Sequence, residues 1–99
     1  VTEKNALLQN FPNPFNPETW LPYQLAEGAN VKINIYDLSG QLVQAVDLGY
    51  KDAGTYISSG RAAYWNGKNN IGECLASGIY FYTITAGNFT ASRRMLLVK

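Results

Sequence analysis

The chain has no histidine among its 99 residues and a single cysteine, Cys74. Without an imidazole it lacks the commonest general base and the commonest metal ligand of proteins. One thiol forms neither an intrachain disulfide nor a thiolate zinc cluster, and no histidine is present to activate it as a nucleophile. We therefore expect Cys74 to be a small apolar residue, buried or half-buried, rather than a reactive group.

Acidic residues and serines are present, but they form no catalytic pattern. The seven carboxylates fall near predicted turns and strand ends, where charges are ordinarily solvated. The serine hydroxyls have no histidine to activate them, and no glycine-rich turn precedes a helix that could bind phosphate. The sequence therefore predicts that the chain is not an enzyme and holds no cofactor or metal ion.

Charge and long apolar runs are also scarce. Eight Lys and Arg residues are balanced against seven Asp and Glu residues, which leaves a net charge of +1. Arg93-Arg94 is the only adjacent basic pair, so nucleic acid is disfavoured as a partner. No apolar run approaches the roughly 20 residues of a membrane span. A net charge so near zero gives little protection against weak self-association.

What the sequence does contain is a repeated alternation of apolar and polar residues, separated by turn signals. The clearest case is Val31, Ile33 and Ile35, which alternate with polar neighbours and predict a strand with one buried face. The predicted strands are 21–25, 31–36, 41–47, 56–57, 62–65, 77–86 and 89–98. About seven short strands at this spacing favour an all-β fold, an antiparallel β-sandwich.

Prolines and glycines refine these predictions. Pro22 suggests that the strand at 21–25 lies at a sheet edge. Glycines bracket a predicted loop at 49–54. The run 77–86 is apolar on both faces, which predicts a central strand, whereas the mixed faces of 89–98 predict a bulge.

The segment Asn10–Pro17 contains three prolines, which remove three backbone donors and hold the chain extended. One interpretation is a stiff connector whose Phe11 and Phe15 lie on the sandwich. The other is a peptide-recognition segment, because extended proline-rich stretches dock into aromatic grooves. We expect residues 1–18 to form an extended entrance segment packed on the domain and residues 19–99 to form the sandwich.

Three segments carry a resemblance to a known family. Residues 9–19 read Gln-Asn-Phe-Pro-Asn-Pro-Phe-Asn-Pro-Glu-Thr, residues 77–82 read Ser-Gly-Ile-Tyr-Phe-Tyr, and residues 93–99 read Arg-Arg-Met-Leu-Leu-Val-Lys. Together they resemble the C-terminal immunoglobulin-like sorting or anchoring domains of secreted bacterial proteins, some of which the type IX secretion machinery recognises. These domains are similar to the Ig-like domain of the flagellar hook-capping protein. The resemblance implies an immunoglobulin-like β-sandwich of about seven strands.

The resemblance also implies a function. We expect a non-catalytic C-terminal module of a longer exported bacterial protein, secreted or at the cell surface, with passenger domains upstream in the same chain. It would act in secretion sorting or surface attachment. Residues Arg93, Arg94 and Lys99 at the end of the chain are the candidates for contact with the secretion or anchoring machinery.

Two alternatives stay open. The module could bind carbohydrate or protein, with Trp20, Tyr50 and Tyr56 as the candidate surface, or it could be a spacer that self-associates through sheet edges. Members of the family often carry Asp in a loop where this chain has Asn66. Here Asn66, Asn69 and Glu73 supply a single carboxylate, too little for a tight calcium site, and whether they hold a weak cation stays open.

Overall fold

The computed structural model describes residues 4–98, and these residues form nine strands and no helix. Among them there is accordingly no helix that could cross a membrane. The strands are β1 (Ala6–Leu7), β2 (Thr19–Leu21), β3 (Tyr23–Leu25), β4 (Ala29–Tyr36), β5 (Leu42–Lys51), β6 (Gly54–Tyr56), β7 (Ala63–Trp65), β8 (Gly78–Ala86) and β9 (Phe89–Leu97). Nine are found where about seven are predicted, because the second layer is divided into short pieces.

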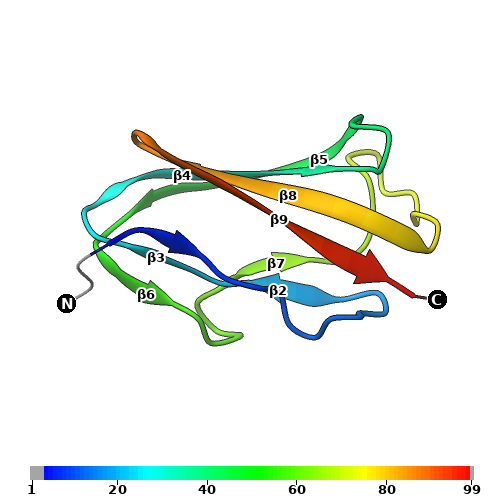
Figure 1. The fold of residues 1–99 in the computed structure, drawn as a ribbon, viewed down its shortest axis with the longest axis horizontal. Coiled ribbons are helices and arrows are strands. Elements are labelled where there is room, and N and C mark those ends of the chain that lie inside the picture. Colours follow the sequence, from blue (N-terminus) through cyan, green and yellow to red (C-terminus); the bar gives the residue numbers. More distant parts are fainter. Residues whose placement is uncertain (1–3, 99) are drawn as a thin grey trace.

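The strands form two packed layers, the antiparallel β-sandwich that the sequence predicts (Figure 1). One layer is a four-stranded sheet in the order β5-β4-β8-β9. The facing layer consists of the three-stranded sheet β1-β3-β6 and the two-stranded sheet β2-β7. Every pairing between these strands is antiparallel. The strand β8 is central in its sheet, as its apolar sequence predicts.

The core lies between the two layers and follows the period-two pattern of the strands. In β4 the side chains of Val31, Ile33 and Ile35 are fully buried, while Lys32 between them is exposed. Trp65 of the facing layer contacts the rings of Phe15 and Tyr80, with centroids 5.6 and 5.7 Å away. Burying a valine or isoleucine side chain, as in β4, stabilises a fold by roughly 1.5–3 kcal/mol.

Three local predictions are wrong. The strand expected at 21–25 is broken at Pro22, and its second half, β3, is central between β1 and β6 rather than at an edge. The loop expected at 49–54 begins later, because Gly49 lies inside β5 at a register shift opposite Val31. The bulge expected in 89–98 is absent, since β8 and β9 pair in an unbroken register from Gly78 to Ala86.

The N-terminal part of the chain is tied into the sandwich by a buried polar cluster. The hydroxyl of Tyr82 accepts a hydrogen bond from the backbone N–H of Asn10 and donates one to the carbonyl of Leu8, both at 2.8 Å. The side-chain amide of Asn10 donates to the Thr19 hydroxyl at 2.9 Å. Asn10 and Thr19 are almost fully buried, so these bonds satisfy groups that water does not reach.

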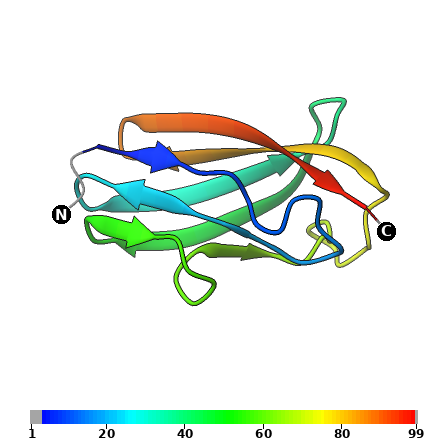
Figure 2. The same cartoon turned by 60° about the horizontal axis from the view of Figure 1, so that its bottom comes forward.

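The proline-rich segment lies along the outer edge of β9, where Figure 2 shows the N-terminal part of the chain beside β9. The N–H of Phe15 donates to the Leu96 carbonyl at 3.0 Å, and the N–H of Val98 donates to the Phe15 carbonyl at 2.9 Å. The Asn13 side chain accepts from the Leu96 N–H at 3.0 Å. The ring of Phe15 is buried in the core. The segment therefore covers the edge of the last strand.

Candidate interaction surfaces

The structure separates the basic residues that the sequence brings together at the end of the chain. Arg93 pairs with Tyr82 across the strands and donates from Nε to the Leu7 carbonyl at 2.6 Å, which ties β9 to β1. Arg94 pairs with Phe81 and lies on the opposite, outward face of the sheet. Lys99 lies outside the described residues. Both side chains are exposed, but Arg93 is tied to β1, so of this pair Arg94 is the one whose side chain has no hydrogen bond to another strand among the described residues.

Trp20 lies in a row of aromatic rings on the β2-β7 sheet. Its ring is 6.0 Å from that of Phe11 with an interplanar angle of 20°, and 5.6 Å from that of Tyr64. Trp20 and Phe11 are half-buried, while Tyr64 is 44% exposed. Desolvation, and then the Glu18 carboxylate that Tyr64 bonds, raise the pKa of the Tyr64 hydroxyl. The sequence predicts that Phe11 lies on the sandwich as part of the proline-rich segment. Its stacking on Trp20 is seen only in the structure.

Tyr50 and Tyr56 line a hollow on the surface beside the end of β5. Tyr50 is well exposed, but Tyr56 is buried, with its ring stacked on Tyr23 at 4.8 Å and its hydroxyl donating to the Asp52 carbonyl. The guanidinium of Arg61, which also lines the hollow, lies over the Tyr56 ring, 4.8 Å from its centroid. Tyr50 therefore offers a surface here, and Tyr56 acts mainly in packing. Tyr50 and Tyr56 belong to other sheets than Trp20, so the three residues do not form one surface row.

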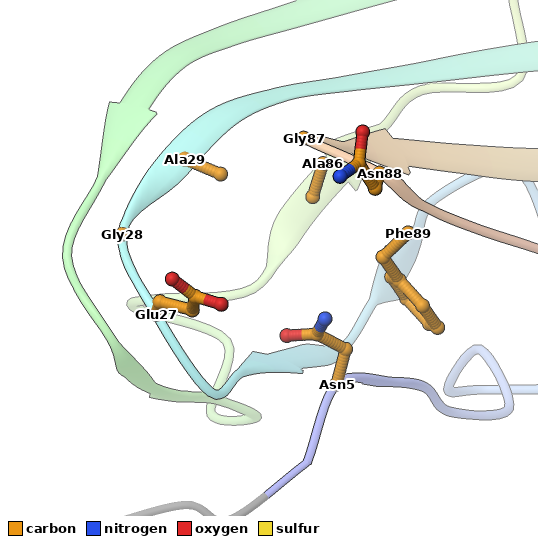
Figure 3. A pocket seen from close by; sticks show the side chains of 8 residues that line it. All are labelled: Asn5, Glu27, Gly28, Ala29, Ala86, Gly87, Asn88 and Phe89. Carbon is orange, nitrogen blue, oxygen red and sulfur yellow. The ribbon is translucent and has the colours of Figure 1, made fainter.

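A hollow of about 440 Å³ lies at one end of the sandwich, between the turn before β4 and the turn between β8 and β9 (Figure 3). Glu27 and Asn5 point into it, and the ring of Phe89 forms part of its wall. The Asn5 side-chain oxygen already accepts a hydrogen bond from the Ala26 N–H at 2.7 Å. The hollow thus offers one carboxylate and a few amides, with no cluster of acid–base groups.

The loop that raised the question of a weak cation is closed by its own hydrogen bonds. The Asn69 side-chain oxygen accepts from the N–H groups of Ile71 and Glu73, and its amide donates to the Glu73 carboxylate at 2.9 Å. The Asn66 oxygen accepts from the Lys68 N–H. Among residues 4–98 no group of three or more His, Cys, Asp or Glu side chains is arranged to hold a metal ion. These oxygens therefore shape the turn.

Cys74 follows this loop and is exposed, so the prediction that it is buried or half-buried is wrong. It makes an isolated bridge with Lys68 at the mouth of the loop rather than contributing to the core. Apolar character alone predicts burial for a cysteine, but the dense turn sequence around it places the residue on the surface.

Comparison with known proteins agrees with this architecture. The family model described as the FlgD Ig-like domain matches residues 19–89. No curated protein sequence matches the chain. Among solved structures, dimeric latent PorU from Porphyromonas gingivalis is similar over 95% of this chain, with 20% identity and a TM-score of 0.73.

A second solved structure is PorZ, an essential surface component of the type-IX secretion system of the same bacterium. It is similar over 95% of this chain, with 19% identity and a TM-score of 0.60. At such identities the likeness establishes the fold alone. This chain spans 9% of the PorU chain and 12% of the PorZ chain. Because the family model matches well over half of its residues, the chain belongs to the FlgD Ig-like domain family.

Proposed function

We propose that this domain is a non-catalytic module of an exported bacterial protein and that it acts in secretion sorting or cell-surface attachment. The observation that carries the proposal is the likeness of its fold to part of PorZ, a surface component of a type-IX secretion system. In both solved relatives the matching region is a small part of a longer chain. We infer that this domain is likewise joined to passenger domains in a longer chain.

The outward side of β9 is the proposed recognition surface. Its backbone edge is occupied by the proline-rich segment, through the bonds between Phe15 and the residues Leu96 and Val98. A partner that meets the folded domain would therefore contact side chains such as Arg94 rather than adding a strand to β9. The residues within reach of that partner lie on the outer face of the four-stranded sheet.

The test is export of a reporter enzyme fused to residues 1–99 in a bacterium that has a type IX system, compared with a strain that lacks it. We expect the reporter outside the cell only in the first strain. Removing residues 93–99 should abolish export, but it also removes the buried Met95 and Leu97. Arg94→Ser, with Lys32→Ser as the control on the same sheet face, separates recognition from folding.

One result would overturn the sorting role, and a second would remove the attachment role. Equal export of the reporter with and without the domain would remove the sorting role. Retention of the exported reporter in the medium, with none at the cell surface, would leave sorting but remove attachment.

A second candidate function, glycan binding, is favoured by the aromatic row Phe11, Trp20 and Tyr64. Aromatic faces bind the apolar faces of sugar rings, and the Tyr64 hydroxyl and Glu18 carboxylate would supply polar contacts. A glycan array with the intact domain tests it. Signals lost in both Trp20→Ala and Tyr64→Ala, but kept in Tyr36→Ala on the other layer, would support binding at this row. An array without signals would exclude it.

A further inference from the structure

The outer face of the four-stranded sheet is divided into two halves of different chemistry. Residues directly opposite each other in antiparallel strands share a face, so the register assigns the face row by row. In the half nearer the β8-β9 turn the outward residues are Lys32, Asn34, Asp47, Thr83, Thr85, Thr90 and Ser92, with Ala45 beside them, and the last row pairs Asn30 with the exposed Tyr50. Apart from Ala45 and the single ring of Tyr50 at its end, this half is polar, as the solvated face of a sandwich ordinarily is.

The other half is apolar. One row across all four strands consists of Leu42, Tyr36, Phe81 and Arg94, and the next row consists of Ile79 and Leu96. These six residues are called the apolar half-face below. Leu42 is 51% exposed, Ile79 39% and Leu96 38%, and the two rings are half-buried.

Strand propensity does not account for this contrast, because the two halves lie on the same four strands. Along β4, β8 and β9 the outward positions of the polar half are Asn, Lys, Thr and Ser, so nothing in the pairing of these strands requires Ile, Leu and Phe in the other half. A contiguous exposed apolar patch on a domain surface is characteristic of a contact with another molecule. The apolar half-face therefore has the composition of a docking surface.

Charge identifies the kind of molecule that fits. In the polar half Lys32 lies opposite Asp47, so opposite charges are adjacent within the face. Arg94 is the single charged residue of the apolar half-face, and among residues 4–98 it forms no ion pair. It borders a hollow of about 200 Å³ lined also by Asn13, Ile79, Met95 and Leu96. A carboxylate placed in this hollow would meet an unpaired guanidinium beside apolar side chains.

We propose that the apolar half-face docks an acidic, apolar protein segment whose carboxylate pairs with Arg94 and whose apolar side chains cover Phe81 and Leu96. A second copy of this chain is a poor fit, because face-to-face contact would bring two arginines together with no carboxylate in either half-face. The interaction is a property of the isolated domain and does not rest on a role in export.

The experiment uses the isotopically labelled domain and two synthetic peptides of alternating residues, Leu with Glu and Leu with Lys. We expect the Glu peptide to shift the backbone resonances of Tyr36, Ile79, Phe81 and Leu96, and the Lys peptide to bind more weakly, by roughly two- to fivefold. Arg94→Glu should reverse the preference. Lys32→Glu makes the same charge change in the polar half and should leave both affinities unchanged.

Leu96→Ser tests the apolar part of the surface. Because Leu96 is exposed, the variant should keep the spectrum of the folded domain and bind the Glu peptide several-fold more weakly. Equal affinity for the two peptides, shifts confined to the polar half, or unchanged binding by Leu96→Ser would overturn the proposal. So would loss of the half-face resonances with rising protein concentration alone, since that outcome identifies a second copy as the occupant.

Discussion

The four-stranded sheet has two edge strands, β9 and β5, and different parts of the chain cover their free hydrogen-bonding groups. Along β9 the covering groups come from far away in the sequence: the backbone of Phe15, the Asn13 side chain, and the Gln9 amide, which donates to the Arg94 carbonyl at 2.9 Å. Along β5 the covering groups are mostly close neighbours in the sequence.

In β5 the Gln44 side chain accepts from the N–H of Ala45, and the Asp47 carboxylate accepts from the N–H of Gly49. One longer-range bond, from the Asn70 N–H to the Val43 carbonyl, adds to them. The free hydrogen-bonding edge of β9 is thus covered as soon as the domain folds, because the covering segment is held in place by the buried ring of Phe15. The edge of β5 is protected by polar side chains outside the core, the half-buried Gln44 and the exposed Asp47.

The largest expected effect comes from removing the core anchor of the β9 cover. Phe15→Ala deletes a buried ring that contacts Trp65, and we expect it to lower the free energy of unfolding by about 3–5 kcal/mol. Denaturant titration measures the loss, and hydrogen exchange at the amides of Leu96 and Val98 reports whether the edge opens. Phe11→Ala, at a half-buried ring, serves as the control and should cost less. Unchanged exchange at both amides would contradict the anchoring role.

The next effect depends on pH and concerns Tyr23, whose buried hydroxyl has no hydrogen-bond partner among residues 4–98. Burial, and then the neighbouring Tyr56, raises the pKa of Tyr23 to about 12. Because the pKa of Tyr23 is higher in the folded protein than in the unfolded chain, the folded state is favoured while this hydroxyl is neutral. This contribution to the free energy of unfolding is complete below pH 10 and is lost as the pH rises from 10 to 12. Between neutral pH and pH 12 the wild type should lose about 2–3 kcal/mol more than Tyr23→Phe. Parallel losses in the two proteins would refute this.

Tyr82→Phe tests the polar anchor of the β9 cover. The change removes the hydroxyl that bonds both Asn10 and Leu8, leaving a buried N–H and a buried carbonyl without a partner. We expect a loss of about 1–3 kcal/mol at neutral pH. Tyr23→Phe is the matched control, because it removes an unpartnered hydroxyl and should be neutral or slightly stabilising. A similar effect of the two substitutions at neutral pH would show that the bonds of Tyr82 are not the cause.

The smallest effect on stability is expected at the other edge. The double variant Gln44→Ala, Asp47→Ala removes two polar caps from β5 and should change the free energy of unfolding by less than about 1 kcal/mol. It should, however, increase self-association, because the freed edge can pair with another copy. Sedimentation velocity over a concentration series measures this, with Lys32→Ala as the control. A variant that stays as monomeric as the wild type would show that the caps do not protect the edge.

The sequence predicts the long strands well, because their signal is local. In β4 every second residue is apolar, and this period alone specifies both the strand and its buried face. The wrong predictions concern positions whose conformation depends on pairing with a neighbouring strand. Gly49 resembles a loop residue, yet pairing with Val31 keeps it in β5, and the two apolar faces of β9 suggested a bulge that the regular pairing with β8 does not contain.

The site predictions divide in the same way. Tyr50 lies in a predicted loop, and only its pairing with Asn30 beyond the register shift places it on a strand; the outward position of Arg94 follows from alternation with the buried Met95 and Leu97. The burial of Tyr56 does not, because it depends on stacking against Tyr23 from another strand. The row of Phe11, Trp20 and Tyr64 joins three segments that are distant in the sequence, so only the two bridging strand contacts reveal it.

The sequence by itself determined the class of this protein: an all-β domain without histidine, whose alternating residues specify two faces on each long strand. The faces of Arg93 and Arg94, in contrast, are assigned by the pairing of β9 with β8, which places them opposite Tyr82 and Phe81. Only the tertiary structure decided that Phe15 enters the core and carries the proline-rich segment onto the edge of β9. The physical reason is that a residue's face is set by local geometry, whereas its partner is chosen by all the surfaces that compete to be buried.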